Sequence, residues 1–238
     1  MKRFVLASVI AFSFFAANDA AAEKAVRPSR SSSDALAASL LRQAPGLKGE
    51  VLRLALDAAQ AAGERGLVRR RDIITVIDYS LPSTQPRLFV FDLSTRKLLF
   101  RELCAHGKNS GGNLTNFFSN SPGSLATSLG LFVTGDTYMG GNGYSLRLRG
   151  LEEGVNDMAL DRAIVMHGAS YVSRAAIQAL GRLGRSWGCP AVPKEVAKKI
   201  INTVRGGSAV FAYYPEKRWL QTSEFFRRKP KTVVAGND

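Results

Sequence analysis

The residues best suited to chemistry in this 238-residue chain are one histidine and one cysteine. His167 follows a short apolar run, and Cys189 comes 22 residues later, between Gly188 and Pro190. A thiol becomes a strong nucleophile when a base takes its proton, and the base need only be close in space. A glycine lets the backbone bend sharply, so the amides of Gly188 and Cys189 could face a developing oxyanion. The pattern predicts covalent catalysis; the alternative is a structural cysteine and a core histidine.

The segments around this pair resemble a family of cell-wall enzymes. The run His167-Gly168, followed by Ser186-Trp187-Gly188-Cys189, is similar to the catalytic motif of the murein L,D-transpeptidase catalytic domain family, a divergent branch of the L,D-transpeptidases. The resemblance covers roughly residues 70–215, and further matching segments are Phe89–Leu93, Ala105–Gly111, Phe118–Asn120, Gly143–Leu148, Asn156–Asp157 and Gly184–Pro193. It implies a β-rich catalytic fold and an enzyme acting on peptidoglycan stem peptides.

The resemblance also implies roles for single residues. Cys189 would attack the carbonyl of the third residue of a tetrapeptide stem, release the terminal D-alanine and hold a thioester. His167 would be the base, oriented by the backbone carbonyl of Gly168. We expect this pair to rest as thiolate and imidazolium. Ser186 would brace the loop before the nucleophile, and Gly188 would contribute an amide to the oxyanion hole.

Substrate contacts are expected on both sides of the nucleophile. The resemblance places His106 and Lys108 at the rim of the active site, and Arg185 and Trp187 directly precede the Gly-Cys pair. Cationic side chains at Lys108, Arg185 and Arg147 suit the carboxylates of a stem peptide, and guanidinium groups bind carboxylates in a fork. Surface solubility is the alternative explanation for all three. For His106 the alternative is a loop residue beside a glycine.

Two positions depart from the pattern of the main family. Trp187 stands where a second histidine is usual, and Pro190-Ala191-Val192 replaces the usual arginine or asparagine after the cysteine. Three functions stay open, because the sequence does not choose between transfer and hydrolysis and Trp187 keeps a protein without turnover among the alternatives. The leading one is a cysteine acyltransferase, the second is an L,D-carboxypeptidase using the same site, and the third is an envelope protein that binds peptidoglycan without turnover.

Charge and the N-terminus predict that the protein is exported to the cell envelope. With 33 basic and 19 acidic residues, the formal net charge is +14, which suits anionic envelope polymers. Residues 1–22 are typical of a signal peptide, with Lys2-Arg3, an apolar run over residues 4–17 and the small residues Ala20–Ala22. We expect export to the periplasm or envelope, with no membrane span after cleavage. The scattered basic residues carry no aromatic stacking motif, so nucleic acid is not an expected partner.

The two cysteines are expected to be free. An exported chain with an even number of cysteines invites a disulfide, but a bridge between Cys104 and Cys189 would block the nucleophile. A zinc site built with His106 and His167 is the other alternative, although the spacing is not typical of zinc ligands. We therefore expect no metal and no cofactor.

Hydrophobic patterns predict a mainly β protein, resembling a sandwich or barrel, with inserted helices and an N-terminal helical hairpin. Strands are expected over residues 73–79, 87–92, 98–105, 129–134, 144–149, 163–166 and 209–214, and helices over 35–42, 47–62, 173–183 and 193–204. Residues 135–143 are expected to form a mobile glycine-rich loop. The expected divisions are a signal peptide (1–22), a linker with the N-terminal helices (23–69), the catalytic domain (70–215) and a solvated basic extension (216–238).

Overall fold

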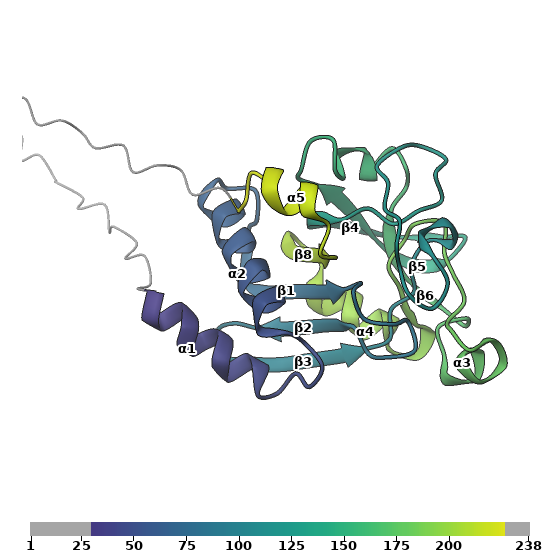
Figure 1. Ribbon diagram of the computed structural model, residues 1–238, viewed down its shortest axis with the longest axis horizontal. Helices are drawn as coiled ribbons and strands as arrows, with labels where there is room; N and C mark the ends of the chain where they lie inside the picture. The colour runs from purple at the N-terminus through teal and green to yellow at the C-terminus, as the bar shows by residue number, and fades with distance from the viewer. Residues whose placement is uncertain (1–29, 227–238) are drawn as a thin grey trace, which may run out of the picture.

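A computed structural model describes residues 30–226 of the chain (Figure 1). The expected signal peptide, the start of the linker and the end of the basic extension lie outside the described residues. Within residues 30–226, no helix has the length and apolar character needed to cross a bilayer.

Eight strands form one mixed sheet. They are β1 (Arg70–Asp78), β2 (Leu88–Asp92), β3 (Lys97–Glu102), β4 (Gly130–Gly140), β5 (Gly143–Gly150), β6 (Val165–Ala169), β7 (Ala191–Pro193) and β8 (Ser208–Tyr213). Their order is β3-β2-β1-β8-β4-β5-β6-β7. Only β1–β8 and β6–β7 pair in parallel among the described strands. The Ala105 N–H donates to the Ala191 carbonyl over 2.8 Å, which joins the two sheet edges into a nearly closed barrel. The expected fold class is confirmed.

The N-terminal helices cover one face of this sheet (Figure 1). They are α1 (Arg30–Leu41) and α2 (Gly49–Glu64). The apolar residues of α2 recur at helical spacing, and Val51 and Ala58 are fully buried in the same cluster as Phe89 and Phe211 of the sheet. Burial of this stripe holds the hairpin on the barrel.

A second core lies on the opposite face of the sheet. It is built on α4 (Lys194–Val204), whose Ile200 and Ile201 pack among Leu146 of β5 and Met166 of β6. The short helix α3 (Arg174–Leu180) begins after Ser173, whose hydroxyl accepts a hydrogen bond from the Ala176 amide. Two 3₁₀ turns, η1 (Lys108–Ser110) and η2 (Asp157–Ala159), complete the connections. The second core thus backs the strands that carry the predicted catalytic histidine.

Two expectations about local structure are wrong. Residues 135–140 continue β4 and pair with β5 in a hairpin, and a register shift between Thr134 and Thr137 absorbs the glycine there. The segment after residue 216 is not a solvated extension throughout, because it forms α5 (Lys217–Thr222). Trp219 is only 3% exposed, and its Nε1–H donates to Glu152 Oε2 over 2.9 Å.

Candidate active site

Strand pairing sets the predicted histidine, on β6, beside the predicted cysteine, which lies just before the neighbouring strand β7. His167 of β6 is the parallel partner of Ala191 of β7, and Cys189 precedes Ala191 by two residues. Cys189 therefore lies level with Val165, whose backbone N–H donates to Sγ over 3.4 Å. Since alternate residues of a strand share a face, Val165 and His167 project from the same side of β6. The register, not the sequence separation, sets the thiol beside the strand of the base.

The His167 ring is held in one tautomer by its neighbour. Its Nδ1 lies 3.1 Å from the Gly168 carbonyl oxygen. A carbonyl can only accept, so Nδ1 carries the proton and Nε2 keeps its lone pair. Burial lowers the pKa of His167, and the hydrogen bond to Gly168 opposes that shift. The neutral imidazole is the resting form that these contacts favour, with Nε2 able to accept a proton.

The cysteine also favours its neutral form. Cys189 is 9% exposed, and burial raises the pKa of its thiol. The Val165 amide and the charge of Arg162 offset only part of that rise in pKa. These directions differ from the expected thiolate–imidazolium pair, because desolvation disfavours both charged forms at once.

Ser186 and Gly188 shape the turn over residues 186–189, which carries the predicted nucleophile and is called the nucleophile turn below. The Ser186 hydroxyl donates to the Cys189 carbonyl over 2.7 Å and accepts from the Gly188 amide over 3.1 Å. Gly188 has φ +124°, and a Cβ there would lie 2.8 Å from the Ala126 carbonyl oxygen, so only glycine fits. With the Gly188 amide bound to Ser186, an oxyanion role falls to the Cys189 amide unless the serine turns away.

The nucleophile turn pairs with the segment that follows β3. The Ser186 N–H donates to the His106 carbonyl over 2.9 Å, and the Lys108 N–H donates to the Ser186 carbonyl over 2.8 Å. Arg185 adds a clamp, since its Nη1 donates to the carbonyls of Lys108 and Gly111, each over 2.9 Å. The structure thus joins the two predicted halves of the site through backbone contacts.

The His106 ring is buried and fully engaged. It is 1% exposed, and its Nδ1 lies 2.6 Å from Nη2 of Arg87. A guanidinium only donates, so the His106 proton sits on Nε2, which faces the Gly111 carbonyl at 3.4 Å. Burial and the charge of Arg87 lower the pKa of His106 to about 4. This geometry makes His106 a support for the loop, which differs from the substrate contact expected from sequence.

The other predicted substrate residues reach the surface to different extents. Trp187 is 74% exposed beside the nucleophile turn. The Lys108 side chain is exposed as well, whereas Arg185 is half-buried by its clamp on the loop. Trp187 and Lys108 are therefore free to meet a ligand, and Arg185 has a structural task already.

Sequence reasoning missed Arg162, which lies against the nucleophile turn. Its NH2 nitrogen would be 3.3 Å from a Cβ placed on Gly188. Its guanidinium donates to four oxygens of residues 119–128: the carbonyls of Ser119 and Ala126 and the hydroxyls of Ser124 and Ser128. Arg162 therefore fixes this segment over the turn and sets a positive charge near the thiol. No motif marks it, because its partners are common groups more than 30 residues away.

The second cysteine is distinct from the first in its surroundings. Both Cys104 and Cys189 are free thiols. Cys104 is fully buried, its sulfur lies 4.0 Å from the Tyr79 hydroxyl, and burial raises its pKa to about 11. Across the described residues, no three histidine, cysteine, aspartate or glutamate side chains gather in a group that could hold a metal ion.

The sequence profile of the L,D-transpeptidase catalytic domain matches residues 43–213. The chain belongs to this family. The match begins before α2, so the family domain includes that helix. Comparison with curated proteins gave no match.

Several solved structures are similar to this chain at low sequence identity. An L,D-transpeptidase from Mycobacterium smegmatis is 13% identical over 60% of this chain and 59% of its own, with a TM-score of 0.37. One from Mycobacterium tuberculosis H37Rv is 18% identical over 60% and 58%, with a TM-score of 0.34. The helical cell shape determining protein Pgp2 from Campylobacter jejuni is 15% identical over 69% and 57%, with a TM-score of 0.41. The matched region spans less than three fifths of each of these structures.

Proposed function

We propose that this chain is an exported cysteine acyltransferase, a murein L,D-transpeptidase that acts on peptidoglycan stem peptides through a thioester on Cys189. The observation that carries the proposal is the β6–β7 register, which sets the Cys189 thiol against Val165, two residues from His167. The Gly168 carbonyl holds His167 in the tautomer of a proton acceptor. Membership of the family supports the substrate class.

The first half-reaction transfers the acyl group to the enzyme. Because thiol and imidazole start neutral, Sγ of Cys189 attacks the carbonyl carbon of the third stem residue as its proton passes to Nε2 of His167. The oxyanion accepts a hydrogen bond from the Cys189 amide, and the positive charge of Arg162 lies nearby. The intermediate then collapses, the carbon–nitrogen bond breaks, and His167 returns the proton to the departing amine of D-alanine.

The second half-reaction releases the enzyme. An acceptor amine attacks the thioester carbonyl, His167 takes the amine proton, and the sulfur of Cys189 leaves and regains a proton. The product is a cross-link with a new amide bond. If water takes the place of the amine, the product is a tripeptide and the enzyme is an L,D-carboxypeptidase.

The closed state of the site favours a second candidate, an envelope protein that binds peptidoglycan without turnover. Cys189 is 9% exposed, and the Gly188 amide is already satisfied by Ser186. Turnover therefore requires the surroundings of Cys189 to open for the substrate. A protein that only binds the wall would need no such opening.

Intact-mass spectrometry with a disaccharide tetrapeptide tests the proposal. The wild type should gain the mass of the donor less one D-alanine, and Cys189→Ala should gain nothing. His167→Ala should form the adduct at least about 100-fold more slowly, whereas Cys104→Ala serves as the matched thiol control and should keep it. An adduct that persists in Cys189→Ala contradicts the proposal. No adduct on the wild type, together with retention on isolated sacculi, favours the binding protein.

Export belongs to the same proposal and has its own test. Lys2-Arg3, the apolar run and the small residues up to Ala22 support cleavage after that alanine. The mature protein from the envelope fraction should therefore begin at Glu23 on N-terminal sequencing. Recovery from the cytoplasm of a chain that still begins at Met1 contradicts export.

A further inference from the structure

A cavity of about 390 Å³ lies apart from the nucleophile turn, between the turn after α2 and the β4–β5 hairpin. Three arginines line it, Arg69, Arg147 and Arg149, together with one carboxylate, Asp136. Its apolar wall is formed by Leu67, Val133 and Leu160, and Leu160 is 46% exposed. The cavity thus combines an excess of positive charge with an aliphatic surface.

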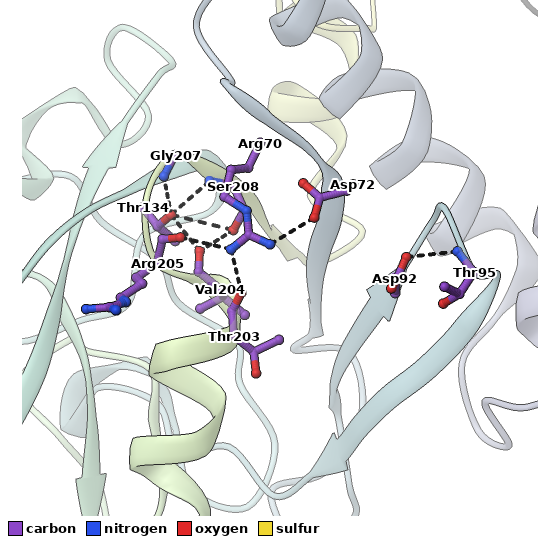
Figure 2. Close-up of polar contacts among 10 residues, drawn as sticks. All are labelled: Arg70, Asp72, Asp92, Thr95, Thr134, Thr203, Val204, Arg205, Gly207 and Ser208. Carbon is purple, nitrogen blue, oxygen red and sulfur yellow. Dashed lines mark hydrogen bonds and ion pairs between the residues drawn. The ribbon is translucent and has the colours of Figure 1, made fainter.

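The floor of the cavity is fixed by backbone contacts. Thr134 Oγ1 accepts from the amides of Gly207 and Ser208 over 3.0 and 2.9 Å, and donates to the Val204 carbonyl over 2.8 Å (Figure 2). The Gly207 carbonyl in turn accepts from the Arg69 amide over 3.1 Å. Buried hydrogen bonds of this kind make the cavity a preformed feature of the fold.

The arginines that line the cavity differ from the neighbouring Arg70 in how far their guanidinium groups are hydrogen-bonded. The Arg70 guanidinium donates to Asp72 over 2.9 Å and to the carbonyls of Thr203 and Arg205 at the end of α4 (Figure 2). In contrast, the side chains of Arg69 and Arg149 make no hydrogen bond or ion pair with any residue in the range 30–226. Arg147 stacks on Tyr138 with its Cζ 4.4 Å from the ring centroid. These guanidinium groups keep donors available for a ligand.

The cavity and the thiol occupy one face of the sheet. Arg147 of β5 is the antiparallel partner of Val165, the residue whose amide contacts the Cys189 thiol. Paired residues project to the same face, and neighbouring strands lie roughly 4.8 Å apart, so the backbones of Arg147 and Cys189 are about 10 Å apart. A short peptide can span that distance, since an extended chain rises about 3.3 Å per residue.

We propose that this cavity binds a peptide with free carboxylates, small aliphatic side chains and an amino group. Guanidinium groups pair with carboxylates in a fork, the aliphatic wall suits alanine-sized side chains, and Asp136 suits an ammonium group. Taken with the proposed function, on which this step rests, the peptide is a stem carrying a diamino acid and D-alanine. The cavity then anchors the charged end of a stem while another part of the same stem reaches Cys189.

Chemical-shift titration of the Cys189→Ala protein tests this assignment. The probe is the free stem tetrapeptide, and its matched control is the same peptide with amidated carboxylates. The amides of Gly135 and Gly207, which line the cavity, should shift on titration with the free peptide. The pair Arg69→Gln and Arg149→Gln, made together, should weaken binding about tenfold, as should amidation of the peptide, and the two losses should not add.

A second pair of variants controls for net charge. Arg42→Gln and Arg174→Gln, made together, remove the same charge from exposed positions outside the cavity and should leave the affinity within about twofold of the starting protein. The assignment is overturned by an absence of shifts at Gly135 and Gly207, by equal losses in the two pairs, or by additive effects of mutation and amidation. Binding here without any adduct on wild-type Cys189 would overturn the proposed function alone.

Discussion

At the scale of the residue, the proposed site combines a buried thiol with a buried imidazole. Both charged forms lose hydration, so the pKa of Cys189 rises and that of His167 falls. A neutral pair avoids an uncompensated charge until substrate arrives. The reactivity of the thiol should then follow pH in a way that differs from an ion-paired cysteine.

Alkylation of the native protein by iodoacetamide measures how the reactivity of the Cys189 thiol depends on pH. The rate at Cys189 should rise steadily with pH and stay below that of a free cysteine, whose pKa is about 8.5, because the raised pKa leaves less thiolate at any pH below it. Cys104, fully buried with a pKa near 11, should react more slowly still. Peptide mapping by mass spectrometry separates the two rates. A rate plateau for Cys189 reaching down to acidic pH would instead reveal a thiolate–imidazolium pair.

Arg162 provides the second prediction at this scale. Its positive charge lowers the pKa of Cys189, so Arg162→Gln should move the alkylation profile of Cys189 to higher pH. The displaced profile should lower the alkylation rate at neutral pH, because less of the thiol is then present as thiolate. Arg162→Lys should recover part of the shift because it keeps the charge.

The readout separates an electrostatic role from a structural one. Loss of the hydrogen bonds from Arg162 to residues 119–128 alone would loosen the segment and expose Cys189, which raises its alkylation rate without the predicted shift in pH. Arg174→Gln, on an exposed helix, is the matched control and should keep the wild-type profile. A faster reaction in Arg162→Gln at every pH contradicts the electrostatic assignment.

At the scale of the element, the sequence predicted strands more reliably than their connections. A continuous run of β-branched residues marks β1, and it is visible in the sequence without knowledge of the strand's partners. The three-residue β7 was not predicted, because Pro190 and Pro193 obscure a strand that exists through pairing with His167. The motif pointed to His167 and Cys189 as the residues of the site. It did not point to Arg162, because the contacts of Arg162 depend on how a distant loop folds back.

The C-terminal helix α5 is a second feature that the sequence did not predict, because it depends on tertiary contacts. It also gives a prediction about stability. Its basic composition suggested a solvated segment, yet Trp219 is buried among aromatic residues and bonds to the buried Glu152. Trp219→Ala should lower the free energy of unfolding by about 3–5 kcal/mol, measured by urea denaturation. The neighbouring exposed Lys217→Ala should change it by less than about 0.5 kcal/mol. Equal effects of the two substitutions would mean that α5 is not packed on the barrel.

At the scale of the whole molecule, the proposed function predicts that positive charge, +14 over the full chain, draws the protein to peptidoglycan. Peptidoglycan carries many stem carboxylates, so the attraction acts over a distance before any specific contact forms. That distance shortens with salt, from a Debye length of about 10 Å at 0.1 M to about 3 Å at 1 M. Capture by the wall and chemistry at Cys189 should therefore respond differently to ionic strength.

Sedimentation of the Cys189→Ala protein with isolated sacculi measures the first step without turnover. Binding should fall at least about tenfold between 0.05 and 1 M sodium chloride, since screening removes the long-range attraction. Alkylation of wild-type Cys189 by the neutral reagent iodoacetamide should change little over the same range, because the thiol is buried and its charged neighbour Arg162 is half-buried. Retention on sacculi that is indifferent to salt would assign wall binding to local contacts rather than to overall charge.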